Sequence, residues 1–77
     1  MPKLPRVSGK ELLQVLQHEG FQVLRVRGSH HYLRQSDTAA LIVVPIHGNR
    51  TLPIGTLSAI LKQAGLTTED LIRLLER

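Results

Sequence analysis

A short stretch near the middle of the chain concentrates side chains that can bind phosphate and move protons. Residues 25–34 contain three arginines, two histidines and a tyrosine around a Gly-Ser pair. Guanidinium groups bind phosphate oxygens through paired hydrogen bonds, and an aromatic ring offers a stacking surface for an unpaired base. An imidazole titrates near neutral pH, so it can accept or donate a proton. Together these residue types could bind and cleave an RNA phosphodiester without a metal ion.

The pair Gly28-Ser29 predicts a two-residue β-hairpin turn, because glycine tolerates the positive φ needed at the first turn position. A strict two-residue loop fixes the cross-strand pairs, which are Arg27 with His30, Arg25 with Tyr32, Val23 with Arg34, and Leu24 with Leu33. Side chains alternate between the two faces of a strand. One face, expected to face solvent, carries Arg25, Arg27, His30, Tyr32 and Arg34. The other, expected under the helices, carries Leu24, Val26, His31 and Leu33.

These side chains also have plainer interpretations. His30 could be an ordinary surface histidine beside a turn, the arginines could form a solvated face, and Tyr32 could simply pack on the sheet. We expect His31 to be a partly buried structural residue. A register slip of one residue would exchange the two faces, and with them the two histidines.

A second polar stretch follows the third expected strand and contains His47 and Arg50. His47 could be a second proton-transfer group, although an ordinary loop residue is the interpretation that the pattern favours. The chain's four histidines lack HxH or HExxH spacing, the acidic residues are scattered, and there is no glycine-rich phosphate loop. The sequence therefore predicts no metal site and no cofactor.

The remaining patterns predict the elements that position these residues. Ser8 and Glu11 form a capping box that starts a helix, which Gly20 ends. Strands are expected at residues 22–27, 30–35 and 40–46, with a turn at 36–38, and the aliphatic third strand suits the most buried place in the sheet. Further helices are expected at residues 54–64 and, capped by Thr67 with Asp70 behind it, over the last residues. The order αβββα(α) predicts one α+β domain over residues 1–77, a three-stranded antiparallel sheet with helices on one face.

The composition sets the class of partner. The chain has 77 residues, no cysteine, ten Lys and Arg against six Asp and Glu, and a pI near 10.4. Such a basic domain predicts a polyanionic partner, and the missing cysteines exclude disulfides and fit a cytoplasmic protein. The longest apolar run, residues 39–45, is too short to span a bilayer, and no signal peptide is recognised. We therefore expect no membrane association.

Several motifs lie along the chain: Arg-Gly-Ser-His-His-Tyr at 27–32, Pro-Ile-His-Gly-Asn-Arg at 45–50, Gly-Thr-Leu at 55–57, Ile-Leu-Lys-Gln-Ala-Gly-Leu at 60–66, and Ser-Gly-Lys-Glu-Leu at 8–12 with Gly20-Phe21. In their order and spacing, these motifs resemble those of the HicA toxins. The resemblance covers almost the whole chain. It implies a fold like the double-stranded-RNA-binding domain and a toxin that cleaves messenger RNA. It also implies a HicB-type antitoxin as partner, and His30, the histidine of the Gly-Ser-His motif, as the catalytic residue.

The hypothesis is therefore a metal-independent endoribonuclease. Neutral His30 would take the proton of a ribose 2′-hydroxyl while arginines stabilise the phosphate charge. The general acid is open among His47, Tyr32 and water. The expected RNA contacts are Arg25, Arg27, Gly28, Ser29, Tyr32, Arg34, His47 and Arg50. An acidic antitoxin is expected to cover this basic face. The alternatives are a non-catalytic RNA-binding module using the same face and a domain that only docks an acidic protein.

Overall fold

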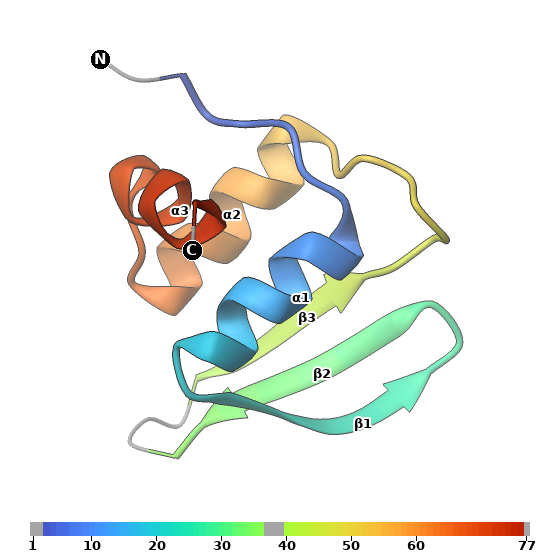
Figure 1. Ribbon diagram of the computed structural model, residues 1–77. Helices are drawn as coiled ribbons and strands as arrows, with labels where there is room; N and C mark the ends of the chain where they lie inside the picture. The colour runs from blue at the N-terminus through green and yellow to red at the C-terminus, as the bar shows by residue number, and fades with distance from the viewer. Residues whose placement is uncertain (1–2, 37–39, 77) are drawn as a thin grey trace.

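Three helices and one three-stranded sheet make up the computed structural model over the residues that it describes, 3–36 and 40–76 (Figure 1). The elements are α1 (Gly9–His18), β1 (Phe21–Arg27), β2 (His30–Gln35), β3 (Leu41–Pro45), α2 (Ile54–Ala64) and α3 (Thr68–Leu75). The sheet is antiparallel in the order β1-β2-β3, and the helices lie together on one side of it. This confirms the predicted α+β class and the αβββα order of a double-stranded-RNA-binding domain. No helix in the described ranges is long and apolar enough to cross a membrane.

The predicted capping boxes fix the starts of α1 and α3. At α1, the Glu11 N–H donates to Ser8 Oγ at 3.1 Å and the Ser8 N–H donates to Glu11 Oε1 at 2.8 Å. At α3, Thr67 and Asp70 exchange the same two bonds at 3.0 and 2.9 Å. The hydrogen bonds from Thr67, and then that from Arg73, lower the pKa of Asp70 below its ordinary value. Each cap satisfies N–H groups that the helix itself leaves unpaired.

One apolar core lies between the helices and the inner face of the sheet. The side chains that the helical and strand periodicities select are buried there: Leu12, Val15, Leu16, Leu33, Ile42, Val44, Leu57, Ile60 and Leu61. Helix α1 approaches the end of β3 closely at its start, where a Cβ on Gly9 would collide with the Pro45 carbonyl oxygen. The helix then runs toward the start of β1, and so it crosses the sheet diagonally (Figure 1).

Strand β1 departs from the regular ladder that the sequence predicted. The pairs Arg27–His30 and Arg25–Tyr32 are confirmed, but the register shifts between Val23 and Arg25, so Leu24 is the extra residue of a β-bulge. Beyond it, Val23 pairs with Leu33 and Gln22 with Arg34, so the predicted pairs Val23–Arg34 and Leu24–Leu33 are wrong. The bulge has a physical reason. Phe21 and Val23 pack into the core, while Arg25 and Arg27 are exposed, and a regular strand would put all four on one face.

One further expectation fails at an edge of the sheet. Leu24 and Val26 are 52% and 51% exposed, and not under the helices as predicted, because β1 is an edge strand whose hairpin end lies away from α1 (Figure 1). Strand β3 is the other edge, yet it is the most buried of the three strands, as predicted, because Ile42 and Val44 are fully buried and only Leu41 is exposed. The central position belongs to β2. The turn predicted at 36–38 includes residues 37 and 38, which lie outside the described ranges.

Candidate functional site

Five candidate side chains lie on the side of the sheet that faces away from the helices. Leu33 is fully buried beneath the helices, so its chain neighbours Tyr32 and Arg34 lie on the opposite side of β2, as does His30 two residues earlier. The register adds Arg25 opposite Tyr32 and Arg27 opposite His30. We call this set, Arg25, Arg27, His30, Tyr32 and Arg34, the open face. Tyr32 is half-buried and the other four are exposed.

The turn that creates this register is the one predicted. Gly28 has φ of 58° and thus supplies the positive φ at the first turn position, while Ser29 keeps an ordinary φ. A Cβ at Gly28 would meet nothing within 4 Å, so glycine is needed there for backbone conformation and not for space. The turn places the side chains of Arg27 and His30 side by side at its base.

Arg25 and Tyr32 form a cation–π pair on the open face. The guanidinium carbon of Arg25 lies 4.9 Å from the centroid of the Tyr32 ring, a contact worth about 0.5–1 kcal/mol at an exposed site. The pair holds a stacking surface and a phosphate-binding group together. Within the described residues, 3–36 and 40–76, the only ion pair joins Arg73 to Asp70. Within those ranges, therefore, no carboxylate neutralises the arginines of the open face.

The two histidines at the start of β2 have different surroundings, as expected. His30 is exposed and has Arg27 as its partner on β1 and Pro45 as its partner on β3. His31 is half-buried on the helix side, and its Nδ1 is buried with no hydrogen-bond partner among the described residues. The open imidazole can reach a substrate, whereas the other contributes to the packing of the sheet.

The loop that carries His47 and Arg50 is attached to the site by its backbone. The Ile46 N–H donates to the Ser29 carbonyl oxygen at 2.6 Å, and the Arg50 N–H donates to the His47 carbonyl oxygen at 3.0 Å. The loop thus begins beside the hairpin turn, and both His47 and Arg50 are exposed. His47 thus follows Pro45, the residue paired with His30, by two positions, and Arg50 lies three residues further along the same turn.

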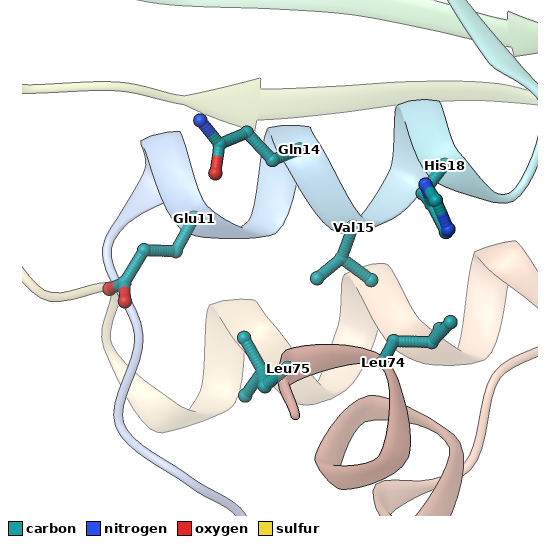
Figure 2. Close-up of a pocket in the computed structure, with 6 residues that line it drawn as sticks. All are labelled: Glu11, Gln14, Val15, His18, Leu74 and Leu75. Atoms are coloured by element: carbon teal, nitrogen blue, oxygen red, sulfur yellow. The ribbon is translucent and has the colours of Figure 1, made fainter. Parts of the chain in front are cut away.

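A hollow of about 400 Å³ lies on the opposite part of the molecule, between α1 and α3 (Figure 2). Its lining is Glu11, Gln14, Val15, His18, Leu74 and Leu75. Figure 2 shows Val15 and the two leucines facing one another between the helices, with the polar side chains around them. The sequence pattern did not reveal this hollow, since it assigned the apolar residues to the core. It contains no residue of the open face, and Glu11 is already engaged in the cap of α1.

The described residues contain no group of three or more His, Cys, Asp or Glu side chains placed to hold a metal ion. The open face itself offers imidazole, guanidinium, phenol and backbone amide groups. Such groups can bind an anionic backbone, stack on a base and transfer protons.

A comparison with protein families identifies the family of the chain. The model of the family described as the HicA toxin of bacterial toxin–antitoxin systems matches residues 9–66. The match runs from the start of α1 to just beyond α2 and includes the open face, the hairpin turn and the loop with His47. No curated protein matches the chain. Because the family model covers most of its length, the chain belongs to the HicA family of toxins of bacterial toxin–antitoxin systems.

Proposed function

We propose that this HicA-family toxin is a cytoplasmic endoribonuclease that cleaves messenger RNA on the open face of its sheet. The observation that carries the proposal is the placement of an exposed imidazole, His30, directly opposite the guanidinium of Arg27. The cation–π pair of Arg25 and Tyr32 lies in the next position of the same face. Proton transfer, phosphate binding and base stacking can then act on one nucleotide.

In the proposed reaction, neutral His30 accepts the proton of a ribose 2′-hydroxyl, and the 2′-oxygen attacks the adjacent phosphorus. The bond from phosphorus to the 5′-oxygen breaks, which gives a 2′,3′-cyclic phosphate and a free 5′-hydroxyl. Arg27, with Arg25 and Arg34, stabilises the charge that builds on the phosphate oxygens. A positioned general base contributes about 10²–10⁴-fold to the rate. No metal ion and no cofactor takes part in this proposal.

The RNA contacts extend along the face and around the turn. Tyr32 stacks on an unpaired base, Gly28 and Ser29 let the backbone of the turn approach the substrate, and Arg34 binds a neighbouring phosphate. The loop residues His47 and Arg50 lie at the far end of the same path. Single-stranded RNA is the fitting substrate, since its bases are free to stack.

The family implies a HicB antitoxin as partner, and we propose that an acidic surface of it covers the open face. The chain has a formal net charge of +4, and the arginines of the open face have no ion-pair partner within the described residues. An acidic protein would bind these groups and exclude RNA at the same time. Regulation would then need no internal inhibitory segment.

Incubation of the purified protein with RNA in the presence of EDTA tests the proposal. Cleavage by the native chain and its loss in His30→Ala, with RNA binding retained, is the expected result. His18→Ala is the matched control, because His18 is an exposed histidine on α1 that has no part in the site. RNA that is shifted but stays intact would indicate a non-catalytic RNA-binding module, and no shift at all would indicate a protein-docking domain.

A further inference from the structure

We infer that His47 is the general acid of the proposed cleavage, the group that protonates the 5′-oxygen as it leaves. This inference rests on the proposed function and goes beyond it, since the sequence left the acid open among His47, Tyr32 and water. Three observations support it: the face on which His47 lies, its distance from His30 along the ladder, and the bonds that hold its backbone.

The first observation is the face. In β3, Val43 and Pro45 pair with Tyr32 and His30 and so share the open face with them. The next residue, Ile46, turns its side chain to the helix side, because its Cγ1 lies 3.0 Å from where a Cβ on Gly9 of α1 would be. Continuing this alternation one residue past Ile46, beyond the end of β3, would put the His47 side chain on the side of His30. His47 is exposed, as this placement requires.

The second observation is proximity. Strand β3 ends at Pro45, but the 2.6 Å bond from the Ile46 N–H to the Ser29 carbonyl oxygen continues the ladder by one residue. His30 pairs directly with Pro45, so in the extended ladder His47, two residues further on, would be its diagonal neighbour. Such neighbours have Cα atoms about 7–8 Å apart, within reach of aromatic side chains. The entering and leaving oxygens lie on opposite sides of the phosphorus, and two imidazoles at this spacing can serve one each.

The third observation is that the backbone of His47 is held on both sides. Before it stands the bond from Ile46 to Ser29, and after it the Arg50 N–H closes a turn onto the His47 carbonyl oxygen at 3.0 Å. Gly48 supplies the positive φ of that turn, 58°. Further on, the Leu52 N–H bonds to the Val7 carbonyl oxygen at 2.8 Å. An acid held in place before the substrate binds loses little conformational entropy during the reaction.

The other candidates fit the role less well. The ring of Tyr32 is already in contact with the guanidinium of Arg25, and this pair suits base stacking. Arginine side chains do not release their proton in proteins, so they can stabilise charge but cannot serve as the acid. A water molecule could donate the proton, but no part of the fold would orient it as the backbone orients His47.

The decisive experiment uses two RNA substrates that differ in one atom. In one, the leaving 5′-oxygen at the cleaved linkage is replaced by sulfur, which leaves as a thiolate and needs no proton. We expect His47→Ala and His47→Gln to cleave ordinary RNA at least about 100-fold more slowly than the native chain. On the sulfur substrate the deficit should shrink to less than about 10-fold, whereas His30→Ala should remain slow on both, since it lacks the base.

The pH profile gives a second readout. A general acid must be protonated, so the native rate should fall at alkaline pH, and both His47 variants should lose this alkaline fall. An equal deficit of the His47 variants on both substrates would assign His47 to binding or structure and overturn the inference, as would unimpaired cleavage of ordinary RNA. If the native chain cleaves neither substrate, the proposed function itself fails. His18→Ala and the thermal unfolding curves of all variants control for folding.

Discussion

His30 and His31 are neighbours in the chain, and the sheet gives them opposite surroundings. One lies exposed between Arg27 and Pro45, and the other is half-buried on the helix side with a buried nitrogen that has no partner among the described residues. A strand alternates its faces at every residue, so a step of one position separates a group available for chemistry from a group that packs. The comparison shows that residue type alone does not identify the site, because the register decides which histidine can meet a substrate.

The largest expected effect is on catalysis, where substitutions of His30 and His31 should differ most. His30→Ala should lower kcat/KM for RNA cleavage by about 10²–10⁴-fold, because the general base is lost. His31→Leu should leave cleavage within a few-fold of the native rate, since its side chain lies on the other side of the sheet. Single-turnover cleavage with each variant is the measurement. A folded His31→Leu protein that has lost its activity would contradict the division between the two faces.

Leu33 and Arg34 are a second pair of chain neighbours on opposite faces, and their substitutions should differ in their effect on stability. Leu33→Ala should cost about 2–5 kcal/mol of unfolding free energy, because the side chain is fully buried. Arg34→Ala, one position along on the open face, should change stability by no more than about 0.5 kcal/mol. Urea denaturation of both variants measures the difference.

RNA binding, in contrast to stability, should depend on Arg34. Its loss should weaken binding and reduce the slope of log affinity against log salt by about 0.7, as expected for one phosphate contact on a single strand. Binding measured at several salt concentrations tests this. An unchanged slope would remove Arg34 from the RNA path.

A smaller effect is expected at the buried nitrogen. His31→Leu removes a polar atom that has no hydrogen-bond partner among the described residues and should raise the unfolding free energy by about 1 kcal/mol. Thermal and urea unfolding at neutral pH provide the measurement. A loss of stability instead would mean that the Nδ1 atom is hydrogen-bonded in solution, for example to an ordered water molecule.

The smallest expected effect is a change in stability with pH at Asp70, which should leave RNA cleavage unaffected. The folded state lowers the pKa of Asp70 below 3.8, chiefly through the Thr67 hydrogen bonds and then through Arg73. Its carboxylate therefore stabilises the fold above pH 3.8, and this contribution disappears as pH falls through the lowered pKa. Asp70→Asn should be slightly less stable than the native chain at pH 6, and the difference in stability should shrink as pH falls below 3.8 and through the lowered pKa. Cleavage should not change, because α3 contributes no residue to the open face.

Patterns within a few residues of each other predicted much of the fold. The two capping boxes join residues three apart, and the turn at Gly28 fixed the two nearest cross-strand pairs, so neither depended on distant parts of the chain. The bulge at Leu24 could not be foreseen in this way. It exists because Phe21 and Val23 pack into the core, while Arg25 and Arg27 stay in solvent. In a regular strand these four side chains would share one face.

The primary structure alone determined the class of the domain, the helix boundaries, the basic charge and the hairpin that joins His30 to Arg27, because each follows from composition or from neighbours along the chain. Only the tertiary structure decided which strands form the edges, which apolar side chains of β1 stay exposed, and that His47 returns beside the hairpin turn. Those features depend on contacts between segments far apart in sequence. Their formation is governed by where α1 crosses the sheet and by the bond that continues β3 past Pro45.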